Sequence, residues 1–294
     1  MMNLTPVAAS AYSCLLGEGP VWDTGNQRLL WVDILNGNLH QFYPETGAGS
    51  IFEAGKFVGS IVLRQNNGII AALQDGFTEI DLHIGSIKDL STPDCHPAGN
   101  RFNDGKCDKK GRFWAGTMSL AEIEGAGKLY MLDTDQTITV KVENVTISNG
   151  LAWSADDKLF YYIDTPTRKV VAYDYNIETG SIKNKRTVIT IPEGFGYPDG
   201  MTIDTDGMLW IAFWDGWKVA RWDPFTGALL LQVELPVARV TSCTFGGKNM
   251  DDLYITTAKT GLSQVELIEQ PLAGALFVIK HSGFRGIPPY KYNG

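Results

Sequence analysis

Four polar residues, each followed at once by a glycine, stand at regular distances along the sequence. They are Glu18, Asp104, Asn149 and Asp199. Each precedes a short apolar run, a turn and a segment rich in Val, Ile, Leu and aromatic residues, which is typical of a β-strand. Asn-Gly and Asp-Gly are also common hairpin dipeptides, so each one alone is compatible with an ordinary turn. Their shared position in a repeat favours a common function.

Two degenerate copies of the same phrase, at Val58 and Thr241, bring the number of repeat units to six. The gaps between successive positions are 40, 46, 45, 50 and 42 residues, which is the length of a four-stranded propeller blade. No stretch shows sustained helical periodicity. The sequence therefore predicts an all-β, six-bladed β-propeller that spans residues 1–294 as a single domain. We expect residues 1–13 to add a strand to the last blade and close the ring.

In such a propeller the polar positions stand immediately before the innermost strands. Because these strands run along the axis, the positions should form a ring around one mouth of the central channel. Carboxylates that face one another in a partly desolvated channel repel strongly, and a bound cation relieves the repulsion. Glu18, Asn149 and Asp199 offer only oxygen ligands and a formal charge of –2, which predicts one divalent ion. Ca²⁺ is the first expectation, with Mg²⁺, Mn²⁺ or Zn²⁺ as alternatives.

The composition restricts partners and compartment. The net charge is –8 and the pI about 5.0, so binding to nucleic acids or anionic membranes has no electrostatic basis. The sequence shows no signal peptide and no apolar run long enough to span a membrane, which predicts a cytoplasmic protein. It has no signature of an oligomeric state. The chain has four cysteines, Cys14, Cys95, Cys107 and Cys243. They are too scattered for a disulfide framework, which predicts reduced thiols.

Other features of the chain bear on the chemistry. The four histidines fall in outer-strand or loop contexts, which argues against a His-based triad. Between Met118 and Lys128 lies an insertion of small and acidic residues. At the mouth of a propeller it could be a substrate lid or merely a long connection.

Eight short motifs are spread over nearly the whole chain: Leu16–Pro20, Asn100–Lys106, Ala115–Met118, Ile147–Leu151, Tyr161–Asp164, Pro198–Gly200, Phe245–Asn249 and Gly286–Tyr290. Together they resemble the family of senescence marker protein 30 (regucalcin), the gluconolactonases and luciferin-regenerating enzyme. The resemblance implies a six-bladed propeller with a single metal ion held by Glu18, Asn149 and Asp199. It also implies sugar-lactone hydrolysis, with Arg101 and Asn103 in contact with substrate hydroxyls.

The chain departs from the family at the lid. Where close relatives place a glutamate after the Ala-Gly-Thr-Met motif, this chain has Ala121, with Glu122 next to it. We therefore name Glu122 as a candidate substrate-binding residue. The preferred pattern of substrate hydroxyls stays open.

The expected function is a metal-dependent sugar lactonase that opens an aldonolactone to its aldonic acid. The ion polarises the carbonyl and stabilises the oxyanion, and Asp199 activates the attacking water. The planar guanidinium of Arg101 suits ring hydroxyls. Asp104 either contacts and orients the metal ligands without binding the ion itself or is only a turn residue. Two alternatives remain: an organophosphate or aryl-ester hydrolase on the same site, and a non-catalytic calcium-binding regulatory propeller.

Overall fold

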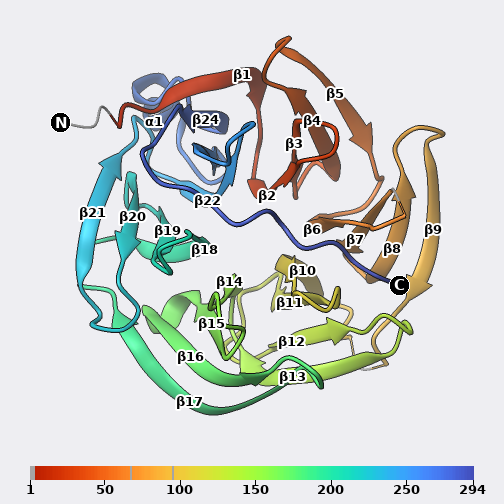
Figure 1. Cartoon of the computed structure of the whole chain (residues 1–294). Helices are drawn as coiled ribbons and strands as arrows, with labels where there is room; N and C mark the ends of the chain where they lie inside the picture. Colours follow the sequence, from red (N-terminus) through yellow and green to blue (C-terminus); the bar gives the residue numbers. More distant parts are fainter. Residues whose placement is uncertain (1–3, 67, 95) are drawn as a thin grey trace.

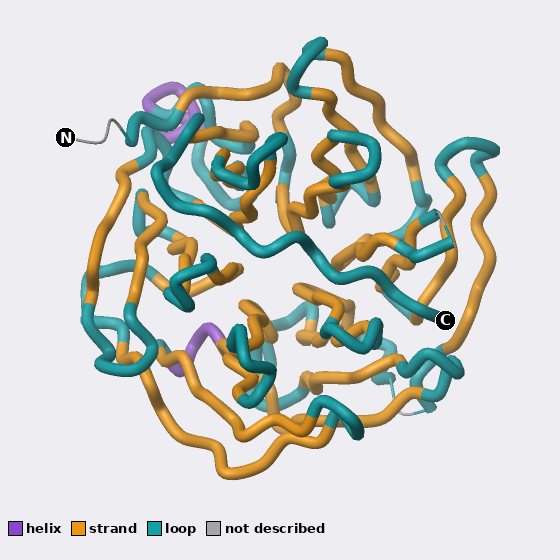
Figure 2. The backbone as a smooth tube through the Cα atoms, viewed as in Figure 1, coloured by secondary structure: helices purple, strands orange, loops and turns teal. Residues whose placement is uncertain are grey.

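The computed structural model of the chain describes residues 4–66, 68–94 and 96–294. Its strands form six four-stranded antiparallel sheets that surround a central channel like the blades of a propeller (Figure 1). Strands make up most of every blade, and the helical segments of the described residues are short (Figure 2). They are η1 (Thr165–Thr167) and α1 (Gln264–Glu269). The predicted fold class and the scarcity of helix are confirmed.

The inner half of each blade consists of two strands that are buried along most of their length. The innermost strands are β2 (Gly17–Asp23), β6 (Val58–Leu63), β10 (Asn100–Cys107), β14 (Ser148–Trp153), β18 (Tyr197–Ile203) and β22 (Val240–Gly246). The second strands are β3 (Arg28–Asp33), β7 (Ile69–Leu73), β11 (Phe113–Ser119), β15 (Leu159–Asp164), β19 (Leu209–Trp214) and β23 (Asp252–Thr257).

The outer half of each blade is increasingly exposed toward the rim. The third strands are β4 (Asn38–Tyr43), β8 (Gly76–Asp81), β12 (Gly127–Leu132), β16 (Lys169–Asn176), β20 (Lys218–Trp222) and β24 (Ala275–Ile279). The outermost strands are β5 (Ala48–Glu53), β9 (Ser86–Ser91), β13 (Ile138–Val145), β17 (Ser181–Thr190), β21 (Leu229–Glu234) and β1 (Val7–Ser13).

The ring is closed by the two ends of the chain, as the sequence predicts. Strand β1 pairs antiparallel with β24, so that Val7 lies opposite Val278 and Ala8 opposite Phe277. The last blade is therefore built from β22, β23 and β24 together with the N-terminal strand (Figure 1). A strand from the opposite end of the chain covers the free edge of β24, which would otherwise be open to pairing with another molecule.

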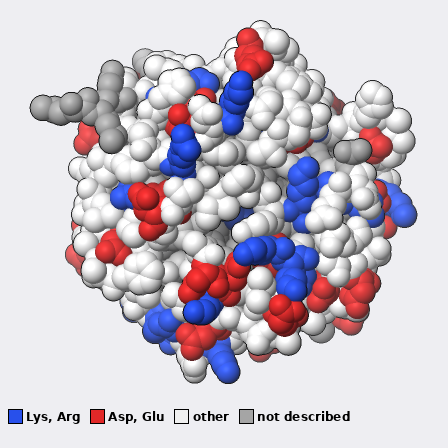
Figure 3. Space-filling view, in the orientation of Figure 1, with Lys and Arg blue, Asp and Glu red and all other residues white. Residues whose placement is uncertain are grey.

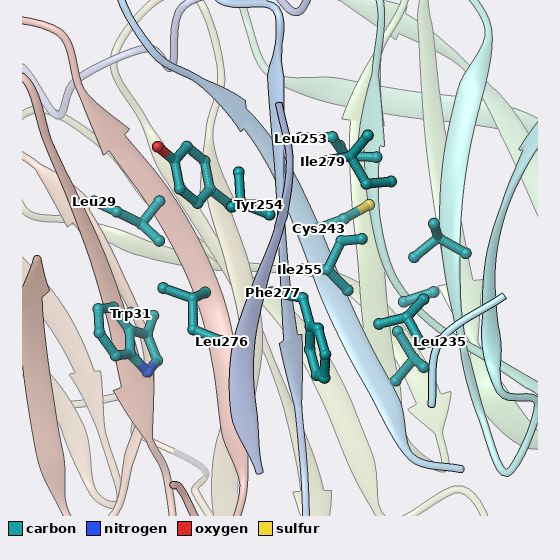
Figure 4. Packing of buried hydrophobic residues seen from close by; sticks show 14 of the residues in the cluster. Leu29, Trp31, Leu235, Cys243, Leu253, Tyr254, Ile255, Leu276, Phe277 and Ile279 are labelled. Carbon is teal, nitrogen blue, oxygen red and sulfur yellow. The ribbon is translucent and has the colours of Figure 1, made fainter. Parts of the chain in front are cut away.

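The core lies between neighbouring blades, whose sheets bury both faces. Figure 4 shows this contact between the first and the last blade: Leu29 and Trp31 lie beside Tyr254 and Leu276. All four side chains are at most 2% exposed, and each such burial stabilises the fold by about 1.5–3 kcal/mol. Because every blade needs a neighbour on each side, the ring must close before the core is complete.

The repeated polar-glycine phrase lies inside the innermost strands rather than before them. In each inner strand the pairing register shifts at this phrase, which marks a β-bulge. The Asn-Gly and Asp-Gly dipeptides are thus not hairpin turns. A Cβ on Gly105 would lie 2.6 Å from Ser60 Oγ, and one on Gly150 would lie 2.9 Å from the Asp199 carbonyl oxygen. Glycine is needed there because adjacent inner strands approach closely.

The C-terminal segment crosses one end of the central channel (Figure 1). It is fixed on one side by a β-bridge between Gly286 and Asp204. On the other side the Tyr292 amide donates to the Leu63 carbonyl, and the Tyr292 hydroxyl donates to the Asp133 carbonyl. Residues 287–290 between these points cover a cavity of about 270 Å³. We call residues 286–292 the C-terminal strap.

On the face seen in Figure 3, acidic and basic side chains are interspersed around the ring. Within the described part of the chain, no helix is long and apolar enough to cross a membrane. Cys14, Cys107 and Cys243 are buried free thiols, as predicted, whereas Cys95 lies outside the described residues.

Candidate functional site

A cavity of about 650 Å³ opens at the end of the channel where the innermost strands begin. It lies at the opposite end from the strap. Six residues singled out from the sequence line this cavity: Glu18, Arg101, Asn103, Glu122, Asn149 and Asp199. They come from β2, β10, β14, β18 and the loop after β11. The circular arrangement of the blades thus brings together side chains that are up to about 180 residues apart in the sequence.

Two acidic side chains form the floor of the pocket. Glu18 and Asp199 are 3% and 5% exposed, and both line the same pocket, close enough for each carboxyl group to affect the pKa of the other. Burial, reinforced by the negative charge of Asp104, raises the pKa of Glu18 to about 8. Burial and the charges of Glu18 and Asp104 raise the pKa of Asp199 well above its usual range. The positive charge of Arg101 opposes both shifts, but it does not outweigh the effect of burial.

Asn149 is held in one orientation beside these carboxyls. Its Nδ2 donates to Thr165 Oγ1 at 2.8 Å, and Thr165 Oγ1 donates to the Pro198 carbonyl at 2.8 Å. Its Oδ1 accepts from Asn103 Nδ2 at 2.9 Å. A carbonyl oxygen has two lone pairs, so one remains to face the pocket. Thr165 follows β15 directly, and sequence analysis did not identify it.

Arg101 and Asn103 extend the polar wall. Arg101 is 6% exposed, and burial lowers the pKa of its guanidinium to about 10. Its Nη1 donates to Asn103 Oδ1 at 2.6 Å and to the Phe102 carbonyl at 3.0 Å. Both hydrogens of Asn103 Nδ2 go to protein oxygens, those of Ser148 and Asn149. Arg101 thus keeps free donors for a ligand, whereas Asn103 offers only an acceptor and chiefly orients Asn149.

Asp104 lies one position away from the pocket. In β10 the last regular pair before the bulge is Phe102, and in β18 it is Pro198. Asn103 in β10 therefore takes the place that Asp199 takes in β18, although the repeat aligned Asp104 with it. Asp104 instead lines the cavity under the strap at the other end of the channel. There its negative charge faces the positive charge of Lys106.

Glu122 stands at the rim of the pocket, in the loop between β11 and β12. The loop is held by backbone hydrogen bonds from Leu120 to Gly99 and from Glu122 to Ser119. Glu122 has a left-handed backbone with φ of 52°, which is rare for a residue other than glycine. Its charge acts on Arg101 across the pocket. The loop therefore lies over the mouth, in the place where the sequence allowed a lid.

Further residues complete the wall of the pocket. Trp214 lines the pocket, and Arg239 stacks on its ring at 4.7 Å. Tyr197 and Arg239 also line the pocket but carry no signal in the repeat. None of the histidines lines it, as expected.

The donor set fits a hard divalent cation. Glu18, Asn149 and Asp199 present carboxylate and amide oxygens from three blades to one space, and hard cations prefer such ligands. Two buried carboxyls with raised pKa values in one pocket are a second sign that a cation would be favourable there. These three residues could hold an ion, while the remaining polar groups face outward to a ligand.

Comparisons with known proteins agree with this geometry. The model of the "SMP-30/Gluconolactonase/LRE-like region" matches residues 16–259. Regucalcin of Oryctolagus cuniculus is 42% identical over 287 residues, covering 96% of each chain. YvrE of Bacillus subtilis (strain 168), whose name designates it provisionally as a sugar lactone lactonase, is 39% identical over 276 residues, covering 93% of this chain and 94% of its own.

The fold is also similar to solved structures. The structure of a luciferin-regenerating enzyme superposes with a TM-score of 0.91 at 32% identity, covering 99% of this chain and 100% of the other. A regucalcin from Agrobacterium tumefaciens gives a TM-score of 0.94 at 24% identity over 98% of this chain and 97% of the other, which supports the fold alone. From the family model and the relatives, we conclude that the chain belongs to the SMP-30/gluconolactonase/LRE-like family.

Proposed function

We propose that this chain is a divalent-metal-dependent lactonase that opens a sugar lactone, such as an aldonolactone, to its aldonic acid. The observation that carries the proposal is the pair of buried carboxyl groups, Glu18 and Asp199, that line the same open pocket. The substrate class is supported by the family description and by the name of YvrE. The cytoplasmic location stays a prediction.

Glu18, Asn149 and Asp199 would hold the ion through oxygen atoms. Ca²⁺ is the first expectation, and Mg²⁺, Mn²⁺ and Zn²⁺ are the alternatives. When bound, such an ion supplies Lewis-acid polarisation of the lactone carbonyl. Thr165 and Asn103 fix the Asn149 amide so that its oxygen faces the ligand space.

The pocket residues hold and orient the sugar ring. Arg101 donates from its free nitrogens to ring hydroxyls, in a planar arrangement that lysine could not reproduce. Asn103 accepts from a hydroxyl through Oδ1. Glu122 at the rim accepts from hydroxyls that reach the mouth of the pocket, and Trp214 presents an apolar surface to the C–H groups of the ring.

Asp199 is the proposed general base. It takes a proton from water as the water oxygen attacks the lactone carbonyl carbon. The bond between that carbon and the ring oxygen then breaks. The ring oxygen leaves as a hydroxyl after it receives the proton from Asp199. The former carbonyl carbon becomes the carboxyl group of the open acid, which ionises by releasing its proton to solvent. Atoms and charge balance with water as the only co-reactant.

The test is a panel of substrates with and without metal. Purified protein should hydrolyse gluconolactone or a pentonolactone with a kcat/KM well above that for aryl esters or organophosphates. Chelation should abolish turnover and Ca²⁺ should restore it. Asp199→Asn should lower kcat by about 10²–10⁴-fold, the usual contribution of a positioned base.

Asp206→Asn is the matched control, because Asp206 lies in the turn after β18 with 68% of its side chain exposed. It should keep full activity. Full activity in Asp199→Asn would contradict the assignment of the base. Tight ion binding without turnover of any lactone would overturn the proposed function and favour a regulatory calcium-binding propeller.

A further inference from the structure

A second cluster of ligand-type side chains lies where the chain passes from the last blade into the first. Cys14 follows β1, Asp33 ends β3 and His40 lies in β4. One sulfur, one oxygen and one nitrogen atom of these residues all lie within 4.8 Å of one another. The three side chains belong to residues that are only 1%, 2% and 4% exposed. None of them lines the active-site pocket.

The spacing of the sulfur and nitrogen atoms matches metal coordination. Cys14 Sγ lies 3.7 Å from His40 Nε2. Tetrahedral Zn²⁺ with a Zn–S bond of about 2.3 Å and a Zn–N bond of about 2.0–2.1 Å separates two such ligand atoms by roughly 3.5–3.6 Å. The two atoms thus already stand close to the separation that a shared ion requires, with no rearrangement of the strands.

The imidazole and the thiol are held in place by their surroundings. His40 stacks on Trp31 with ring centres 4.7 Å apart and contacts the edge of Tyr12. Its Nδ1 is buried without a hydrogen-bond partner among the described residues, so the ring is oriented by stacking and by the contact of Nε2 with Cys14 Sγ. Trp31 Nε1 donates to Cys14 Sγ at 3.4 Å, a contact that also suits a metal-bound thiolate.

The carboxylate is anchored as well. Asp33 accepts hydrogen bonds from the backbone amides of Leu15 and Leu16 and from Asn36 Nδ2. Two of these donors go to Oδ2 and one goes to Oδ1, so a lone pair remains on Oδ1. Asp33 therefore offers a fixed oxygen ligand beside the sulfur and the nitrogen.

We propose that Cys14, Asp33 and His40 form a second metal site, selective for Zn²⁺ or a similar borderline transition metal. A thiolate and a carboxylate balance the charge of a divalent ion, and sulfur with imidazole nitrogen disfavours Ca²⁺ and Mg²⁺. Water would complete the fourth position. The site would join the end of β1 to the first blade and so reinforce the closure of the ring. This inference is independent of the proposed lactonase activity.

The state of the ligands without an ion is consistent with this site. Burial lowers the pKa of His40, so the imidazole is neutral and can donate a lone pair. Burial and the charge of Asp33 raise the pKa of Cys14 to about 12, with Lys259 opposing them. The free thiol is therefore protonated, and metal binding must release its proton to solvent as the metal–sulfur bond forms.

A second group of ligand-type side chains among the described residues lacks the burial that distinguishes the cluster of Cys14, Asp33 and His40. Asp251, Asp252 and His281 also lie within ligand distance of one another. There the His281 side chain is 78% exposed, and Lys280 already neutralises Asp252 at 2.6 Å. Neither burial nor an uncompensated charge points to an ion in that group.

Cobalt titration of the full-length, metal-free protein tests the proposal. A thiolate-to-Co²⁺ charge-transfer absorption should appear in the near ultraviolet, saturate at one equivalent and disappear when Zn²⁺ displaces Co²⁺. No cysteine lines the pocket of Glu18, Asn149 and Asp199, so an ion bound there cannot give this thiolate absorption. Zn²⁺ should also raise the Tm of protein whose pocket is saturated with Ca²⁺.

The variants separate this site from the other sites. Cys14→Ser and His40→Gln should lose the absorption and the Zn²⁺-dependent rise in Tm. Cys107→Ser, which removes an equally buried thiol outside the cluster, and Asp199→Asn should keep both. Absence of the absorption in the wild-type protein, or its persistence in Cys14→Ser, would overturn the proposal. If Cys14→Ser does not fold, the wild-type titration and His40→Gln still decide.

Discussion

The two ends of the central channel are built from the same six strands but differ in every property that matters for function. One end is an open pocket of about 650 Å³ lined by two buried carboxyls. The other is a cavity of about 270 Å³, covered by the strap, in which the charge of Asp104 is opposed by that of Lys106. At the open end the two carboxyls face the single guanidinium of Arg101, so negative charge is only partly compensated, whereas one carboxylate faces one ammonium at the covered end.

The difference indicates how a repetitive scaffold acquires a site. The repeat supplies equivalent positions to every blade, so it cannot by itself distinguish the two ends. At the open end, burying unpaired carboxyls costs stability and prepares a place for a cation. At the covered end, the C-terminal strap adds packing and hydrogen bonds. Substitutions at the two ends should therefore have opposite consequences for activity and for stability.

The largest expected effect is at the open end. Glu18→Gln removes one of the proposed ligands and should lower kcat/KM for a sugar lactone by roughly 10³-fold, about 4 kcal/mol of transition-state stabilisation. The metal-free variant should be at least as stable as the wild type, because one of two repelling groups is gone. Thermal unfolding in chelator, beside lactone kinetics, measures both. A large loss of stability would contradict the comparison.

The covered end should show the reverse. Tyr292 is 1% exposed and packs with Phe77, Phe102 and Phe113. Tyr292→Ala should lower the free energy of unfolding by about 3–5 kcal/mol, as for other large aromatic side chains. Tyr292→Phe should cost only about 0.5–1.5 kcal/mol, for the lost hydrogen bond to Asp133. Activity per folded molecule should be unchanged in both, and a loss of turnover in folded Tyr292→Phe would break the comparison.

The pH dependence of the metal-free protein gives a third test. The pKa of Glu18 is raised to about 8, and that of Asp199 is raised well above its usual range. The folded state therefore holds protons that the unfolded state releases, and stability should fall as pH rises from about 4.5 to 8. Calorimetry in chelator should show a declining Tm over this range. Saturating Ca²⁺ should reduce the decline, since the ion replaces the proton.

A smaller effect is expected from the polar wall. Arg101→Lys keeps the positive charge but loses the planar pair of donors. The loss of one or two hydrogen bonds to substrate should raise KM by roughly 10-fold, with a lesser change in kcat. Steady-state kinetics on two lactones that differ in one hydroxyl measures this. An equal increase of KM for both lactones would mean that Arg101 does not hydrogen-bond the hydroxyl by which they differ.

The smallest effect is expected at the rim. Glu122 is exposed and lies in a loop, so Glu122→Gln should change kcat/KM by less than about 5-fold, mainly through the preference among lactones. Glu124→Gln, two positions further along the same loop and outside the pocket lining, is the matched control. A decrease of kcat/KM by more than 100-fold in Glu122→Gln would mean that Glu122 takes part in catalysis.

The sequence by itself determined the number of blades, the closure of the ring by the N-terminal strand and the residues that gather in the pocket. The physical reason is that a repeat of fixed length places equivalent positions at equivalent points around an axis. The pairing of β1 with β24 and the common pocket of Glu18, Asn149 and Asp199 follow from that symmetry.

Only the tertiary structure decided how each side chain is used. A bulge shifts the register by one residue, and this placed Asn103 rather than Asp104 in the pocket. Close packing of the inner strands, and not turn formation, explains the glycines. Thr165 and Trp214 reach the site from segments outside the repeated phrase, and Cys14 meets His40 only when the ring closes. Such contacts depend on packing between blades, which a one-dimensional period does not contain.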